Sequence, residues 1–159
     1  MTAEFGHHYI AGQWLSDAPN GISEVENPSD GSIIGTAPNG SAGLAENAIM
    51  AAREAFESTD WASNPRQRAA ALLEFADILE KRADEIAALM ARENGKVLAQ
   101  ARHEVAAGYG EARYYAGVAR NVFGRTFESG AGKLSLMTRE PSGVVSVIVP
   151  WNAPVTLLV

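Results

Sequence analysis

The chain contains no cysteine among its 159 residues, and this absence excludes three kinds of chemistry within them. A disulfide framework, a zinc–thiolate site and a thiol nucleophile all require cysteine. Any reaction that uses a thiol would therefore need one supplied from outside these residues.

Long apolar runs and an excess of basic charge are also missing. No run approaches the roughly 18 apolar residues of a membrane helix, and Met1 to His8 lacks the apolar segment of a secretory signal. A formal net charge of −6 offers no electrostatic attraction for nucleic acid or an anionic membrane. The apolar content of 47% is enough to build a core. We expect a soluble, cytoplasmic protein that binds neither nucleic acid nor membrane.

The opening 40 residues predict a small β unit. Residues 9–15 mix β-formers with polar residues before the turn-prone stretch 17–21, which favours a hairpin. Two further strands are predicted at 22–26 and 32–37, separated by turn formers at 27–31.

Apolar residues then recur at helical spacing and predict three helices. Ser41 can cap the first, and Asn64 with Pro65 begins a second that should run to about Glu93 with a break. The third is expected over 97–122. Each glycine inside it costs about 1 kcal/mol relative to alanine. Close packing against a neighbour would explain the three glycines, which are Gly108, Gly110 and Gly117.

The last 36 residues predict the start of a parallel sheet. Residues 124–132 are turn-like, and 133–139 alternate as a half-buried strand does. The β-branched run 143–149, bounded by Pro150, suits a strand buried on both faces of a parallel sheet. Residues 154–159 resemble the start of a crossover helix. Because one strand cannot make a doubly wound sheet, we expect the sequence to stop inside a domain.

The three histidines do not predict a metal site. His7 and His8 lie at the start of the chain, and His103 has no second ligand three or four residues further along its helix. We expect no bound metal.

Asn152 is the strongest candidate for chemistry. It follows the predicted buried strand, and ligands bind outside the carboxyl ends of strands in open α/β sheets. A preorganised amide there can stabilise a developing negative charge by about 3 kcal/mol. Alternatively, Asn152 caps the next helix, and because caps are so common the spacing alone favours that role by about two to one.

Five ordered segments resemble motifs of the aldehyde dehydrogenase superfamily. They are the Asn-Pro-x-x-Gly turn and strand at 27–35, the helix end Glu93-Asn94-Gly95-Lys96, the helix segment 113–117, the stretch 139–145 and Pro150-Trp151-Asn152. Their order and spacing across nearly the whole chain argue against chance similarity.

The resemblance implies an α/β fold, of which this chain is the amino-terminal part. Residues 1–122 would belong to the cofactor-binding domain and 142–159 would start its Rossmann-like sheet. Residues 123–141 would form a β-arm that pairs with another subunit, which implies a homo-oligomer. The alternating pattern of residues 133–139 agrees with an exposed edge that needs a partner.

The resemblance also implies a reaction. A cysteine attacks an aldehyde, hydride passes to NAD or NADP, and the acyl-enzyme is hydrolysed with help from a glutamate. Asn152 would hold the thiohemiacetal oxyanion. Asn152 together with Val149, Pro150 and Trp151 would line the nicotinamide-ribose side of the cofactor site. The family's cysteine, glutamates and pyrophosphate-binding segment lie downstream of Val159, so this chain alone should not turn over aldehyde.

The substrate tunnel would differ from that of many members. Ala153 stands where many have phenylalanine, and ungapped counting places other tunnel-wall positions at His103, Ala107 and Thr156. Many members carry larger apolar residues there. This implies a wider, more polar tunnel and an aryl or otherwise bulky aldehyde, as in the benzaldehyde-type and salicylaldehyde-type members.

Three functions stay open at this point. The first is an amino-terminal portion of an NAD(P)-dependent aldehyde oxidoreductase that forms homo-oligomers. The second is a non-catalytic, truncated relative that associates with a full-length subunit. The third is a free-standing helical binding domain in which Asn152 is only a cap.

Overall fold

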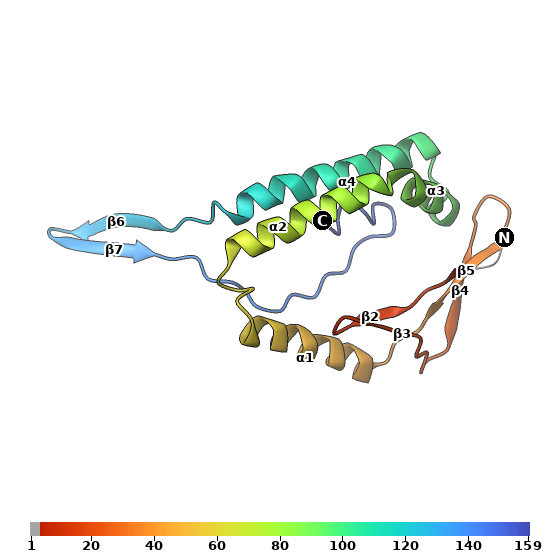
Figure 1. Ribbon diagram of the computed structural model, residues 1–159, viewed down its shortest axis with the longest axis horizontal. Helices are drawn as coiled ribbons and strands as arrows, with labels where there is room; N and C mark the ends of the chain where they lie inside the picture. Colours follow the sequence, from red (N-terminus) through yellow and green to blue (C-terminus); the bar gives the residue numbers. More distant parts are fainter. Residues whose placement is uncertain (1–3) are drawn as a thin grey trace.

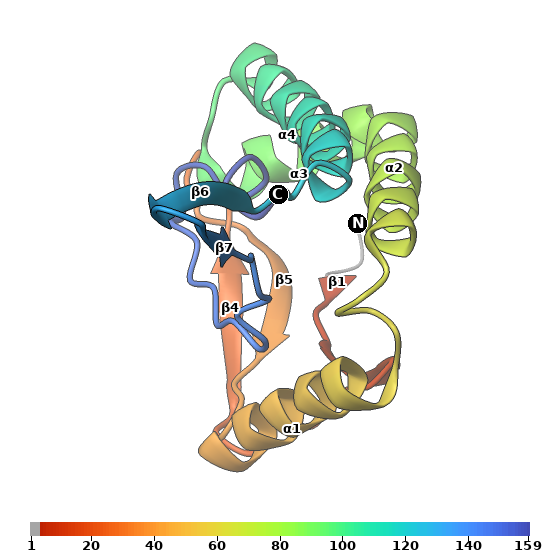
Figure 2. The same cartoon turned by 90° about the vertical axis from the view of Figure 1, so that its left-hand side faces the viewer.

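A computed structural model describes residues 4–159, which form an elongated molecule with four helices and seven short strands (Figure 1). Three helices, α2 (Pro65–Lys81), α3 (Ala83–Asn94) and α4 (Leu98–Ala119), pack together. Helix α1 (Ala42–Ser58) lies on the opposite side of the molecule (Figure 2). The β-hairpin near the C-terminus extends away from the helices at one end (Figure 1).

The predicted amino-terminal β unit is confirmed. Strand β5 (Ile33–Pro38) pairs antiparallel with β4 (Ile22–Glu26) and parallel with β1 (Glu4–Phe5), so the strand order is β1-β5-β4. The predicted hairpin consists of β2 (His8–Ile10) and β3 (Gln13–Leu15).

The turn of this hairpin is Ala11-Gly12, within the stretch 9–15, and not the turn-prone stretch 17–21 that follows it. Both residues have positive φ, 52° and 77°. Two-residue turns of this kind match the twist of the flanking strands.

The predicted helix starts are also confirmed, because they depend on local caps. The Ser41 hydroxyl accepts a hydrogen bond from the Leu44 amide at 3.2 Å, and the Asn64 side chain accepts one from Gln67 at 3.1 Å. Each bond satisfies an amide that has no partner within the first turn of its helix. The break expected in the second helix falls at Arg82, which separates α2 from α3.

The core lies where α2, α3 and α4 meet. Its buried residues are Leu79, Ala87, Met90, Ala101 and Val105. Small side chains on the inner face of α4 allow this helix to approach α2 closely. Arg113 of α4 also donates hydrogen bonds to Asp77 and Glu80 of α2, at 2.8 and 2.5 Å. These bonds raise the pKa of Arg113, and the bond to Glu80 has the larger effect.

Only one of the three α4 glycines fits the packing explanation. A Cβ on Gly108 would lie 2.9 Å from Cγ1 of Val155 and 3.4 Å from Cδ2 of Leu79, so glycine is needed there. A Cβ on Gly110 or Gly117 would meet nothing within 4 Å. The packing explanation is therefore wrong for these two positions.

The prediction of a turn at 124–132 is wrong over most of its length. Residues Arg125–Gly130 form strand β6, which pairs antiparallel with β7 (Lys133–Met137). Strand β6 is exposed on both faces, so it shows no alternation of apolar and polar residues. The turn itself is confined to Ala131-Gly132, where Gly132 has a φ of 67°.

The remaining residues, 138–159, contain neither strand nor helix. The predicted strand at 143–149 is absent because, within the part of the chain that the structure describes, no strand lies beside it to accept its hydrogen bonds. Val145, Val147 and Ile148 are accordingly exposed. The predicted helix start at 154–159 is a series of turns.

No helix within residues 4–159 combines the length and apolar content needed to cross a lipid bilayer.

Candidate functional site

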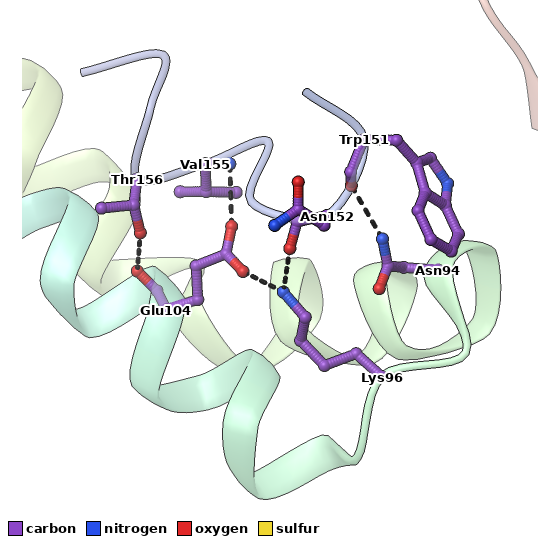
Figure 3. Close-up of polar contacts among 7 residues, drawn as sticks. All are labelled: Asn94, Lys96, Glu104, Trp151, Asn152, Val155 and Thr156. Atoms are coloured by element: carbon purple, nitrogen blue, oxygen red, sulfur yellow. Dashed lines mark hydrogen bonds and ion pairs between the residues drawn. The ribbon is translucent and has the colours of Figure 1, made fainter. Parts of the chain in front are cut away.

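Asn152 lies in a loop, residues 150–156, that is held against α3 and α4 by four polar contacts (Figure 3). We call it the anchored loop. The Asn94 side chain donates to the carbonyl of Trp151 at 2.8 Å, and the Lys96 ammonium donates to the carbonyl of Asn152 at 2.6 Å. The other two contacts involve Glu104. Its carboxylate accepts from the Val155 amide at 3.0 Å, and its backbone carbonyl accepts from the Thr156 hydroxyl at 3.2 Å.

Glu104 and Lys96 form a largely buried ion pair beneath this loop. Their side chains are 9% and 16% exposed. A carboxylate on the buried face of a helix is costly unless each oxygen has a partner. One oxygen of Glu104 pairs with Lys96 and the other accepts from Val155, so both are satisfied.

Gly95 turns the chain so that Lys96 can reach this site. It ends α3 in the left-handed conformation, with φ of 74°, and donates its amide to the carbonyl of Ala91 at 3.0 Å. A Cβ at this position would lie 2.8 Å from Cγ of Pro28, so the close approach also requires glycine. This is why the helix-end motif 93–96 ends with Gly95-Lys96.

Asn152 does not cap a helix here. A capping asparagine accepts from the amide two or three residues later. Pro154 has no amide hydrogen, and the Val155 amide donates to Glu104 instead. The structure thus removes the capping alternative and leaves Asn152 as an exposed side chain on an anchored backbone (Figure 3).

The other residues predicted to contact the cofactor lie in or just before the anchored loop. Val149 is half-buried, whereas Pro150 and Trp151 are exposed. Their proposed contacts with a cofactor stay a prediction.

The predicted tunnel residues come from two elements that the structure brings together. Ala153 and Thr156, both half-buried, lie in the anchored loop. The Thr156 hydroxyl donates to the backbone carbonyl of Glu104 in α4. Ala107, half-buried, and His103, exposed, lie on the same stretch of α4. Their role as a tunnel wall stays a prediction.

Three residues of this site were missed from the sequence: Asn94, Lys96 and Glu104. Asn94 and Lys96 were assigned only to a helix end. Glu104 carried a usable signal, because it falls at helical spacing among small and apolar residues that face the core: Ala101, Val105, Gly108 and Ala112. A carboxylate on such a face requires a partner.

The histidines do not converge. His7 Nδ1 lies 3.1 Å from the Ser16 hydroxyl, near the hairpin of β2 and β3. Within residues 4–159 no group of three or more His, Asp and Glu side chains is arranged to hold a metal ion.

The family model described as "Aldehyde dehydrogenase family" matches residues 14–159. The chain belongs to the aldehyde dehydrogenase family. Alpha-ketoglutaric semialdehyde dehydrogenase of Bacillus subtilis is 41% identical in an alignment of 154 residues that covers 94% of this chain and 31% of that protein. The resemblance inferred from the five motifs is thereby confirmed.

Solved structures of the family confirm the α/β fold class. The NAD-dependent aldehyde dehydrogenase of Sinorhizobium meliloti has a TM-score of 0.92 at 32% identity, over 99% of this chain and 32% of that one. Indole-3-acetaldehyde dehydrogenase of Pseudomonas syringae, solved in complex with NAD+ and IAA, has a TM-score of 0.90 at 29% identity, over the same shares. The chain therefore spans about a third of the length of these family members.

Proposed function

We propose that this chain supplies the oxyanion donor of an NAD(P)-dependent aldehyde dehydrogenase, and that Asn152 is that donor. The observation that carries the proposal is an exposed primary amide on a backbone held by contacts to a largely buried ion pair. A donor that is already fixed before the reaction loses no energy in reorganisation when charge develops. The membership of the family supports the same role.

The proposed reaction needs a thiol from outside these 159 residues. A cysteine thiolate adds to the aldehyde carbon, and the electron pair of the C=O bond moves to oxygen. The Asn152 amide N–H donates to this oxyanion. When the C=O bond re-forms, hydride leaves the carbon, and water then releases the acid and regenerates the thiol. The sum is aldehyde, NAD(P)+ and water giving carboxylic acid, NAD(P)H and a proton.

We propose that residues 149–151 line one side of the cofactor. Val149, Pro150 and Trp151 present apolar surface beside Asn152, and Trp151 is 63% exposed. A flat nicotinamide ring could pack on such a surface. The bound cofactor would supply the hydride acceptor. The chain's own residues would orient it and shield it from water. One neighbour was solved with NAD+, which supports NAD(P) as the cofactor.

We propose an aryl or otherwise bulky aldehyde as the substrate. Ala153 and Ala107 are small, and Thr156 and His103 are polar. If these residues line the tunnel, it is wide and partly polar. A preference for acetaldehyde over benzaldehyde in kcat/KM would contradict this assignment.

The β6–β7 hairpin is the proposed pairing element of a homo-oligomer. It projects from the helices (Figure 1), and Leu134 and Leu136 are each 69% exposed. Apolar side chains on an unpaired hairpin suit pairing with another subunit.

A cytoplasmic location likewise stays a prediction.

The proposed function is tested in a chimeric enzyme. Residues 1–159 are fused to the part of the Bacillus subtilis relative that this chain does not match. We expect Asn152→Ala to lower kcat by about 100- to 1,000-fold without loss of fold. The matched control is Asn121→Ala, which removes an exposed asparagine that binds the Gly117 carbonyl at 2.7 Å, and its kcat should be unchanged.

Equal kcat values for Asn152→Ala and the unsubstituted chimera would overturn the proposal. Together with an intact mass of 16.9 kDa and no NAD+ reduction by the chain alone, that result would support the non-catalytic, partner-binding alternative.

A further inference from the structure

The buried ion pair holds both ends of a short backbone segment. Lys96 contacts the carbonyl of Asn152, and Glu104 contacts the amide of Val155, while Lys96 and Glu104 pair with each other. The Lys96 ammonium, the Glu104 carboxylate, the Val155 amide and the Asn152 carbonyl are thus linked in a ring that is completed by the backbone of residues 152–155 (Figure 3). Asn152, the residue with the free amide, is the first residue of the segment.

Backbone hydrogen bonds within the loop and to the residue after it are longer than those to the ion pair. The Ala153 amide donates to the Pro150 carbonyl at 3.4 Å, and the Leu157 amide donates to the Ala153 carbonyl at 3.3 Å. The contacts to Lys96 and Glu104 measure 2.6 and 3.0 Å and involve charged groups, which makes them stronger. The ion pair therefore contributes more to the order of residues 152–155 than the loop does itself.

We propose that Lys96 and Glu104 are positioning residues that orient Asn152 by fixing the backbone of residues 152–155. This inference rests on the proposed role of Asn152 as the oxyanion donor. An ion pair that served only stability could be replaced by apolar residues at little or no cost. A positioning pair could not, because apolar side chains hold neither the Asn152 carbonyl nor the Val155 amide.

The first test uses the 159-residue chain itself. The double substitution Lys96→Met with Glu104→Leu removes both charges while keeping apolar volume. We expect amide hydrogen exchange at Val155 to become at least about tenfold faster, because its charged acceptor is lost. Exchange at Ala112, in the core of α4, should not change, which separates local loosening from unfolding.

The matched control is Asp84→Asn with Arg102→Gln. It removes an exposed ion pair that links α3 to α4, with side chains 85% and 57% exposed. Exchange at Val155 should stay as in the unsubstituted chain. If Val155 exchange is unchanged in the Lys96/Glu104 variant as well, the positioning role is overturned.

The second test is a double-mutant cycle in the chimeric enzyme. Lys96→Met with Glu104→Leu should lower kcat and kcat/KM together by about 100-fold, as expected for a misplaced transition-state donor. In the Asn152→Ala background the same pair of substitutions should cause no further loss, because it acts through Asn152.

The outcomes separate the two proposals. An equal loss in both backgrounds would mean a structural role for the ion pair and would overturn this inference alone. An unchanged kcat in Asn152→Ala would overturn the proposed function. Lys96 and Glu104 would then have no catalytic role through Asn152.

Discussion

Glu104 is a carboxylate on the buried face of α4, and its partners come from two other parts of the chain, one near and one distant. Lys96 lies in the connection from α3 to α4, and Val155 lies 51 residues after Glu104. The charge is tolerated because both carboxylate oxygens are satisfied. At the residue scale, the function proposed for Asn152 therefore depends on residues that are not its neighbours in sequence.

Asp30 illustrates a purely local effect. Its carboxylate accepts hydrogen bonds from the Ser32 hydroxyl at 2.7 Å and the Ser32 amide at 3.0 Å, and these bonds lower the pKa of Asp30. We predict that Ser32→Ala raises the pKa of Asp30 towards its ordinary value, as followed by NMR titration of the carboxyl group. Ser29→Ala, in the same turn, should leave it unchanged.

The sign of the pH dependence follows from this lowered pKa. The carboxylate is charged and bonded in the folded chain, so its contribution to stability is present above the pKa of the unfolded state. That contribution is lost as the pH falls through the lower, folded-state pKa. A stability that rose on acidification through this range would contradict the assignment.

Gly95 is predicted to be sensitive to substitution, since both its backbone and its surroundings require glycine. Its φ is 74°, and an added Cβ would lie 2.8 Å from the Pro28 ring. Gly95→Ala should lower the free energy of unfolding by more than about 1 kcal/mol, measured by urea denaturation. Gly110→Ala should raise it by about 1 kcal/mol, because that helical position is open. A similar effect of the two substitutions would argue against this structure at Gly95.

At the scale of elements, α1 to α4 were predictable because their signals are local. Ser41, Asn64 and Gly95 cap helix ends through bonds to residues three or four positions away. The strands near the C-terminus were less predictable. Strand β6 has no buried face to create an alternating pattern, and residues 143–149 have the composition of a strand without a strand beside them.

The α2–α3–α4 core gives a direct test of element packing. Leu79 is 6% exposed at the centre of this core, whereas Leu73 on the same helix is 47% exposed. Leu79→Ala should cost about 2–5 kcal/mol of unfolding free energy, through lost burial and the cavity that remains. Leu73→Ala should cost less than about 1 kcal/mol. Comparable losses in chemical denaturation would mean that α2 presents a different face to the core.

At the scale of the whole molecule, the chain exposes many large apolar side chains. They lie on separate elements and include Trp14, Phe123, Leu134, Ile148 and Trp151, which are 63–95% exposed. Relatives of the family are about three times as long as this chain. Surfaces of this kind are typical of faces that contact other protein.

The β6–β7 hairpin is expected to drive self-association of the isolated chain. We predict that Leu134→Lys with Leu136→Lys shifts the chain towards the monomer and raises its solubility, as measured by light scattering after size-exclusion chromatography. The two substitutions remove exposed apolar side chains that would be buried against another subunit. The control, Ser129→Lys with Thr126→Lys, adds the same charge to the neighbouring strand without removing apolar side chains. Equal dissociation by both variants would indicate a charge effect instead.

The sequence by itself determined the family, the helix starts, the amino-terminal β unit and Asn152 as the candidate residue. These depend on ordered motifs, on caps that act over three or four residues and on turns rich in Asn, Asp and Gly. Only the tertiary structure decided that Asn152 is not a helix cap and that Lys96 and Glu104 hold its backbone. Those facts depend on contacts between residues 51 to 57 positions apart, which no local pattern records.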